Sequence, residues 1–262
     1  MNFELSEEQK MIQQSVERFV QENYDLSDRI KISSENPGYS KDYWNSMAEL
    51  GWLGLAFDEE DGGFGGNQID TLVLMEQFGK GLVLEPFLAN IVLAGGAIKR
   101  GASKALKESI IPKLIEGNLQ LTLAYAEEQS RFDIEDVATA AREDAGNFII
   151  NGKKSMVLNA ESADKVVVVT RTSGSQVDIN GISLFLVDLD SEGIERDNFP
   201  TVDGLRASEI TFKDVKVSAE NLIGEKDKGF SILQEVVNDA ILALSAEAVG
   251  AMEVLYKDTV EY

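Results

Sequence analysis

The hydrophobic pattern of this chain changes its period within one stretch, Leu121–Asp133, which has the sequence LTLAYAEEQSRFD. Before this stretch, apolar residues recur at the spacing of helices, and after it, for roughly a hundred residues, they follow the spacing of strands. Helices followed by a run of strands indicate an α+β fold. We therefore expect any activity to lie where the two regions meet.

The first half of the chain carries signals for several helices. Ser6 and Gln9 form a capping box, and Ser40 is placed to cap a second helix. Further helices are expected at about 68–80, 85–100 and 102–116. Pro112 should kink or interrupt the last of these, and Gly117-Asn118 should end the helical region.

An acidic, glycine-rich loop, Asp58–Gln68, interrupts these helices. A phosphate cradle is one interpretation, but the loop lacks the residues of a P-loop and of G-x-G-x-x-G, so a flexible turn is favoured. Its four consecutive acids, Asp58 to Asp61, could bind a hard cation or form a solvated surface. The second interpretation is favoured, and no metal site is assigned.

The second half should form strands joined without intervening helices. A hairpin turn at Asp144–Asn147 separates the segments 137–142 and 148–151. Buried strands are expected at Lys165–Thr170 and Gly181–Val187, with two short ones at Glu209–Phe212 and Val215–Val217. Consecutive strands of this kind predict a mostly antiparallel barrel or sandwich.

A long helix is expected from about Phe230 to the last residue. Its apolar face is too wide for one helix to bury alone. That face is either a docking surface for a partner or the sign of a chain cut short in mid-domain, and we favour the second. The predicted domains are a helical domain at 1–118, a β-domain at 119–226 and the first helix of an incomplete helical bundle at 227–262.

The absence of histidine and cysteine narrows the chemistry available to the 262 residues. Disulfides, thiolate catalysis, Ser-His-Asp chemistry and Cys or His metal sites are excluded. An enzyme would need carboxylates, lysine, tyrosine, backbone amides or an organic cofactor. The formal charge of −22 argues against nucleic acid and anionic membrane as partners. No signal peptide or membrane span is apparent, so a cytoplasmic location is expected.

Three charged residues invite functional interpretations. Glu127 and Glu128 are neighbours, but adjacent strand residues point to opposite faces, so we expect one to be exposed and the other to be held by hydrogen bonds. Arg206 lies just before a strand. It could hold a phosphate or carboxylate of a ligand, or a structural carboxylate such as Asp203 or Asp214. None of these residues identifies an enzyme.

Seven segments in order resemble the acyl-CoA dehydrogenase family. They are LSEEQKMIQQSVERF near the start, ELGWLGLAFDEEDGGFGG, the Ala-x-x-Glu strand at Ala124–Glu127 ending in Asp133, FIINGKKSMVLNA at 148–160, DGLRASEITFKDVKV at 203–217, NLIGEKDKGF at 221–230 and AEAVGAMEVL at 246–255. The nearest likeness is to small subunits of pimeloyl-CoA dehydrogenase and related members that work as paired unlike subunits. The resemblance implies a helical domain, a β-domain and a C-terminal four-helix bundle, with FAD between the last two.

The family's flavin-binding residues are only partly present. The resemblance places Leu123, Tyr125, Ala126, Phe132, Met156 and Leu158 at cofactor-binding positions and Phe132, Asn238, Asp239 and Ile241 at substrate positions. The family usually has threonine at the position of Ala126, serine at Phe132, tryptophan at Met156 and threonine or serine at Leu158. Glu127 and Asp133 are kept. Ala240 stands where some members carry the catalytic glutamate, so no catalytic residue is assigned.

Two hypotheses follow from this resemblance. In the first, the chain is a degenerate small subunit of an FAD-dependent acyl-CoA dehydrogenase, which desaturates an acyl-CoA thioester with a larger catalytic partner or a second copy of itself. An electron-transfer flavoprotein would reoxidise the flavin. In the second, the chain is a non-catalytic interaction or scaffold protein that keeps the fold and has lost the flavin pocket.

Overall fold

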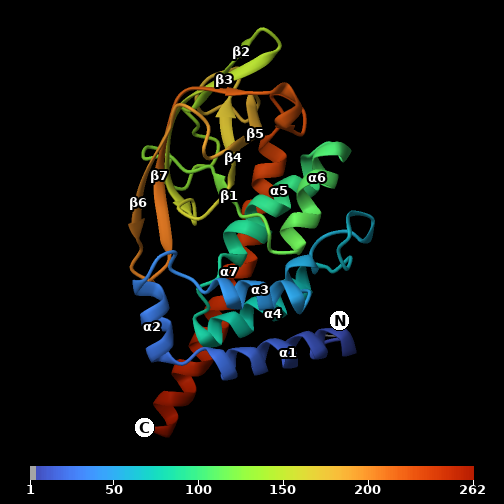
Figure 1. The fold of residues 1–262 in the computed structure, drawn as a ribbon, viewed down its shortest axis with the longest axis vertical. Coiled ribbons are helices and arrows are strands. Elements are labelled where there is room, and N and C mark those ends of the chain that lie inside the picture. Colours follow the sequence, from blue (N-terminus) through green and yellow to red (C-terminus); the bar gives the residue numbers. More distant parts are fainter. Residues whose placement is uncertain (1–3) are drawn as a thin grey trace.

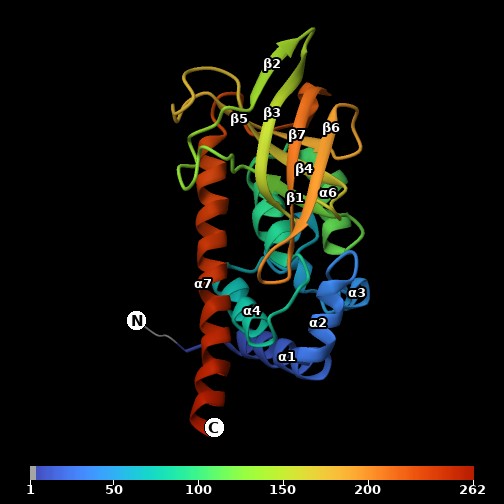
Figure 2. The same cartoon turned by 90° about the vertical axis from the view of Figure 1, so that its left-hand side faces the viewer.

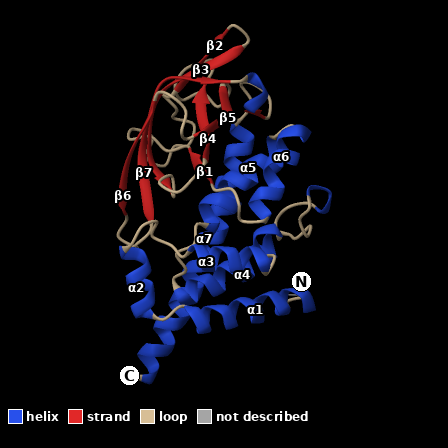
Figure 3. Cartoon of the chain, in the orientation of Figure 1, coloured by secondary structure: helices blue, strands red, loops and turns tan. Residues whose placement is uncertain are grey.

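The chain folds into a helical layer, a bent sheet and one long helix that runs past both (Figure 1). The computed structural model describes residues 4–262. The helical layer contains α1 (Glu7–Asn23), α2 (Leu26–Ser34), α3 (Lys41–Glu49), η1 (Trp52–Gly54), η2 (Glu59–Asp61), α4 (Gln68–Gly81), the π-helix η3 (Leu88–Gly95), α5 (Gly96–Gly101) and α6 (Lys104–Ile115). Figure 3 shows that helices and strands are largely segregated, as the change of period predicts.

The predicted caps are confirmed. The Ser6 hydroxyl accepts a hydrogen bond from the Gln9 N–H at 3.2 Å, and the Gln9 side chain accepts one from the Ser6 N–H at 3.0 Å. The Ser40 hydroxyl likewise accepts from the N–H of Tyr43 at the start of α3. These bonds satisfy N–H groups that a helix leaves free in its first turn. Residues close in sequence therefore determine where α1 and α3 begin.

Two helical features differ from expectation. Helix α2 was not predicted, because it buries none of its residues and so lacks an amphipathic pattern. Helix α6 continues through Pro112 to Ile115, so of the two expected effects, a kink or an interruption, the interruption is wrong. Pro112 removes the hydrogen bond to the Glu108 carbonyl, and Glu108 is exposed, so water can satisfy that carbonyl. Gly117, with a φ of 73°, then ends the helical region as predicted.

The acidic loop before α4 is a turn held by its own backbone. The N–H of Gly63 donates to Asp58, that of Gly65 to Phe57 and that of Gly66 to Leu55. Two of the acids pair with lysines: Asp58 with Lys99 at 2.9 Å and Asp61 with Lys107 at 3.5 Å. In the described part of the chain, no cluster of three potential metal ligands was found.

The sheet is mostly antiparallel. Its strands are β1 (Leu121–Ala124), β2 (Ala140–Asp144), β3 (Asn147–Leu158), β4 (Lys165–Arg171), β5 (Ile182–Asp188), β6 (Ile194–Pro200), β7 (Arg206–Val217) and β8 (Leu222–Ile223). The order is β6-β7-β3-β2-β4-β5-β8, with β1 parallel to β4 on a separate branch. Strands β3 and β7 share a buried core with β4 and β5, where the rings of Phe148 and Phe185 lie 4.6 Å apart. One sheet whose strands enclose a core in this way agrees with the expected mostly antiparallel barrel or sandwich.

Two strand predictions were incomplete. Strand β6 was not predicted, because most of its residues are polar and exposed. The two short strands expected at 209–217 are one strand, β7, with a bulge at Asp214, whose φ is 51°. The bulge faces a shift of register near Gly152 in β3. The bulge inserts one extra residue, which breaks the two-residue alternation of side chains along the strand. The sequence pattern therefore shows two short strands instead of one.

Helix α7 (Phe230–Glu261) runs along the helical layer, as Figure 2 shows. It crosses α4 so closely that a Cβ on Gly250 would lie 1.8 Å from the Glu76 carbonyl oxygen, and one on Gly79 would lie 1.9 Å from that of Glu247. Small residues at such a crossing let the two backbones meet. Away from this crossing, α7 exposes Val249, Met252 and Leu255. None of the helices in the described range 4–262 meets the length and apolarity that crossing a membrane requires.

Candidate active site

The end of β1 and the end of β3 form one continuous backbone surface. The N–H of Ser155 donates to the Ala126 carbonyl at 2.9 Å. Met156, next along β3, has a φ of 52° at a shift in the β3–β7 register. Positive φ is uncommon for a residue with a side chain and recurs at functional sites. The fold therefore brings together the two segments that carry most of the predicted cofactor residues.

The side chains at the predicted cofactor positions differ in exposure. Phe132 is 96% exposed and Met156 is 52% exposed. Tyr125, Ala126 and Leu158 are half-buried. Leu123 is buried in the main core. The exposed side chains are apolar and could lie against the face of a flavin ring. The polar edge of a flavin would have to be held by backbone amides, because Ala126, Phe132, Met156 and Leu158 have no polar side-chain atoms.

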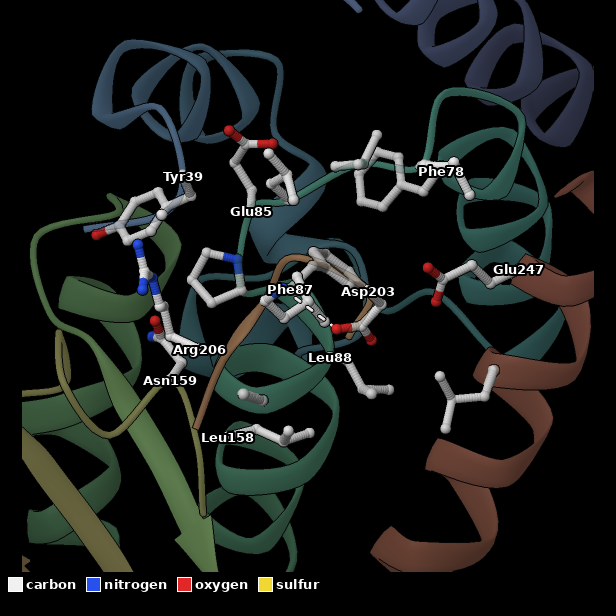
Figure 4. A pocket seen from close by; sticks show the side chains of 18 of the residues that line it. Tyr39, Phe78, Glu85, Phe87, Leu88, Leu158, Asn159, Asp203, Arg206 and Glu247 are labelled. Atoms are coloured by element: carbon white, nitrogen blue, oxygen red, sulfur yellow. Dashed lines mark hydrogen bonds between the residues drawn. The ribbon is translucent and has the colours of Figure 1, made fainter. Parts of the chain in front are cut away.

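A cavity of about 290 Å³ lies beside this surface, between α4, the segment 82–89, the ends of β3 and β7, and α7 (Figure 4). Among the predicted cofactor residues, Leu158 lines it. Its walls are largely apolar, and they include Met75, Phe78, Phe87, Leu88 and Leu244. This volume is near the lower end for a small-molecule site, and an apolar cavity with a few polar groups suits a ligand with a hydrocarbon part.

The predicted substrate residues of α7 lie outside this cavity. Asn238 and Ile241 are exposed. Asp239 accepts hydrogen bonds from Arg100 and from Gln68, and it lines a second cavity. Helix α7 instead contributes Leu244, Glu247, Ala248 and Ala251 to the first cavity. Sequence reasoning missed Glu247. An acidic residue at helical spacing from Leu244 and Ala251, within an apolar stripe, is the signal that could have found it.

Glu127 and Glu128 differ in exposure as expected, but the reason given for it was wrong, because β1 ends at Ala124 and both glutamates lie in the turn that follows it. Glu128 is exposed and Glu127 is buried. The Glu127 carboxylate accepts from the N–H groups of Ala138 and Thr139 and lies 2.7 Å from Nζ of Lys154. Burial would raise the pKa of Glu127, but the charge and hydrogen bonds of Lys154 outweigh burial and lower it to about 2. This buried ion pair fixes the segment that follows β1.

Arg206 makes neither of the structural contacts considered for it. Its guanidinium donates to the carbonyls of Ser33 and Glu35, at 3.1 and 3.3 Å, instead of pairing with Asp203 or Asp214. It thereby ties β7 to the end of α2, and it lines the cavity. The helix it contacts was not predicted, so this partner could not be foreseen.

Glu85 is the most strongly buried acid of the cavity lining. Its Oε1 accepts from the Ser40 N–H at 3.0 Å, and its Oε2 is buried without a hydrogen-bond partner. Figure 4 shows the carboxylate directed away from the middle of the cavity. Burial raises the pKa of Glu85 from 4.5 to about 7, although the Ser40 hydrogen bond opposes the rise. The charged form is therefore disfavoured in the folded protein.

We expect Glu85→Gln to flatten the pH dependence of stability. The folded pKa lies above the unfolded one, so Glu85 favours folding at low pH, and this contribution is lost as the pH rises from 4.5 through about 7. Relative to the variant, the wild type should lose about 2 kcal/mol of unfolding free energy between about pH 5 and about pH 7.5. Urea unfolding at both pH values measures this difference. Glu49→Gln, on the surface of α3, is the control, and equal slopes for wild type and Glu85→Gln would contradict the assignment.

The comparisons with known proteins match two consecutive parts of the chain. Residues 6–118 match the sequence model of the acyl-CoA dehydrogenase N-terminal domain, and residues 122–215 match that of the middle domain. The chain is 29% identical to mitochondrial isovaleryl-CoA dehydrogenase of Pongo abelii, with 98% of this chain and 62% of the relative aligned. It is 27% identical to subunit CarC of the caffeyl-CoA reductase–Etf complex of Acetobacterium woodii, with 98% of this chain and 69% of the relative aligned.

Solved structures agree with the sequence matches. The FAD complex of PigA superposes with a TM-score of 0.90 at 26% identity, over 100% of this chain and 70% of the other. Butyryl-CoA dehydrogenase from Megasphaera elsdenii gives a TM-score of 0.88 at 25% identity, with the same coverage. The chain spans about two thirds of the length of the relatives it matches. It belongs to the acyl-CoA dehydrogenase family, of which it contains the N-terminal and middle domains followed by helix α7.

Proposed function

We propose that this chain is a subunit of an FAD-dependent acyl-CoA dehydrogenase and works with a larger catalytic chain. The observation that carries the proposal is the cavity, which lies beside the joined ends of β1 and β3 and shares Leu158 with them. Its apolar wall suits an acyl chain. A thioester carbon held near Leu158 would lie close to a flavin placed against Ala126 and Met156.

The chain's own residues would bind and orient the acyl group and exclude water from it. Bound FAD would supply the two-electron acceptor for desaturation. The reaction must also remove an α-proton, and Ala240 has no group that can accept it. Ala240 is also largely buried. Since Ala240 cannot accept a proton, we propose that a carboxylate of the larger dehydrogenase chain acts as the base at a shared site.

The proposed electron acceptor is an electron-transfer flavoprotein. CarC is named as a subunit of a complex with Etf. The cytoplasm is the proposed location.

A scaffold role is the second candidate. It is favoured by the apolar side chains of Phe132, Met156 and Leu158, which replace the family's usual polar types, and by Ala240. Each lost hydrogen bond at a buried site costs about 1–3 kcal/mol of binding, so several losses together predict weak flavin binding. In this case the conserved fold would serve only to contact a partner.

The flavin content of purified protein tests the proposal. We expect the chain alone to purify without flavin and to carry it when co-expressed with the larger dehydrogenase chain, because its own surface lacks polar side chains for the flavin edge. The combined substitution Ala126→Thr, Phe132→Ser and Leu158→Thr should raise flavin affinity, measured by fluorescence quenching. Val202→Ser, at an exposed apolar residue of another loop, is the control. A stoichiometric flavin in the chain alone would refute the degenerate-subunit reading, and a flavin-free complex would favour the scaffold role.

A further inference from the structure

The cavity lined by Leu158 and Glu247, here called the acyl-side cavity, contains a second acidic side chain besides Glu85 that lacks a partner in the described part of the chain. Figure 4 shows the Glu247 carboxylate extending from α7 toward the side of the cavity where Asp203 lies. Within residues 4–262, the described range, this carboxylate accepts no hydrogen bond and makes no ion pair. Burial and the charge of Asp203 raise the pKa of Glu247, and Arg29 lowers it. A half-buried carboxylate among apolar side chains is unfavourable unless a donor reaches it.

The neighbouring charged groups already have partners. Arg29 donates through Nε to the Leu82 carbonyl and through Nη2 to the Asp203 carbonyl, each at 2.7 Å. The Asp203 carboxylate accepts from the Thr201 hydroxyl and from the N–H of Leu205. One positive and two negative charges therefore surround this part of the cavity. Asp203 is exposed and its Oδ1 accepts both of these hydrogen bonds, whereas Glu247 is half-buried and its carboxylate accepts none from the described residues, so a ligand donor is matched best by Glu247.

We infer that Glu247 selects acyl groups whose far end carries a protonated amine. This inference rests on the proposed function, because it assumes that the cavity holds the acyl chain. The methylene groups of such a ligand would contact Phe87, Leu88 and Leu244, and its ammonium group would donate to Glu247. The added charge would neutralise the local excess of one negative charge. Charge-assisted hydrogen bonds of this kind are the stronger ones.

Other tail groups match the site less well. A carboxylate would meet Glu247 and Asp203, and Arg29 already donates its hydrogen bonds to carbonyls. A hydroxyl could donate to Glu247 but would leave the negative charge unbalanced. A methyl group would leave the buried carboxylate without a donor, which carries a cost.

The test compares three small probes of equal chain length: hexylammonium, hexan-1-ol and hexanoate. Binding to the full 262-residue chain is followed by nuclear magnetic resonance of labelled alanine methyl groups, because Ala248 and Ala251 line the cavity. Hexylammonium should bind about tenfold more tightly than hexan-1-ol, as expected for a charge-assisted bond. Glu247→Gln should abolish this preference and leave hexan-1-ol binding unchanged. Asp258→Asn, an exposed acid near the end of α7, is the matched control for attraction to the acidic surface.

A second comparison uses hexanoyl-CoA and 6-aminohexanoyl-CoA in titration calorimetry. If hexanoyl-CoA binds and the amino form is not favoured, the inference is wrong while the proposed function stands. If neither thioester binds but hexylammonium still depends on Glu247, the proposed function fails and the amine site remains. Equal binding of the three small probes, or a preference for hexanoate, overturns the inference. The wild-type comparison decides this even if Glu247→Gln does not fold.

Discussion

Lys154→Met should lower the unfolding free energy by about 3–5 kcal/mol, because it leaves a buried carboxylate without its counter-charge. Lys154 is fully buried, and its Nζ lies 2.7 Å from Glu127 and 3.1 Å from the Tyr125 carbonyl. Burial lowers the pKa of Lys154 to about 8, so both members of the pair are charged at neutral pH. The loss can be measured by urea unfolding near pH 7.

The neighbouring lysine supplies the control. Lys153 is half exposed and pairs with Glu209 on the surface, so Lys153→Met should cost at most about 1 kcal/mol. The double variant Glu127→Gln with Lys154→Met should recover part of the loss, because no unpaired charge remains. Similar losses for Lys153→Met and Lys154→Met would show that the buried pair has no special role.

The same pair should also mark the acid limit of stability. The folded pKa of Glu127 is about 2, below its ordinary value of 4.5. Its contribution is therefore present above pH 4.5 and is lost as the pH falls toward 2. The stabilising effect of Glu127 is therefore lost below pH 4.5, whereas that of Glu85 is lost above pH 4.5.

Gly250→Ala should be at least as disruptive as typical overpacking, costing about 3 kcal/mol or more. The new methyl group would lie 1.8 Å from the backbone oxygen of Glu76, which no side-chain rotation can relieve. Helices α4 and α7 would have to separate, and the gain in helix propensity of about 1 kcal/mol would not compensate. Thermal unfolding followed by circular dichroism measures the change.

A substitution on the free side of the same helix separates packing from propensity. Ser245 is exposed on α7, and its hydroxyl donates to the Ile241 carbonyl. Ser245→Ala should change stability by no more than about 0.5 kcal/mol, since it touches no packed surface. A Gly250→Ala protein as stable as this control would contradict a close backbone crossing of α4 and α7.

Features set by neighbouring residues could be predicted from the sequence. The Ser6 capping box, the Ser40 cap and the turn at Gly117 depend on contacts within a few residues, so their residue types are sufficient signals. The buried strand β4 was also recognisable from its four valines. Helix α2 and strand β6 were missed because their polar and exposed residues leave no clear period.

The positions of the site residues were harder to predict. They depend on the shape of the backbone and on contacts between residues that are far apart in the sequence. The resemblance pointed to the ends of β1 and β3, and the fold does join Ala126 to Ser155. The register between β3 and β7 shifts before Val157, and this shift leaves Met156 exposed. No residue type in the sequence predicts such a shift. On α7, Asp239 contacts Arg100 and lines the second cavity, whereas Glu247, more than two turns further along the helix, lines the first.

The crossing of α4 and α7 also bears on the order in which the chain can fold. Helix α4 leaves the ribosome long before α7, with the whole sheet between them. Until α7 is made, the side of α4 around Gly79 has no partner, and the acyl-side cavity lacks one wall. Closing so long a loop is entropically costly, so this contact is expected to form late. During synthesis the nascent chain therefore holds an unfinished cavity, whose apolar lining a chaperone could shield until α7 has been made.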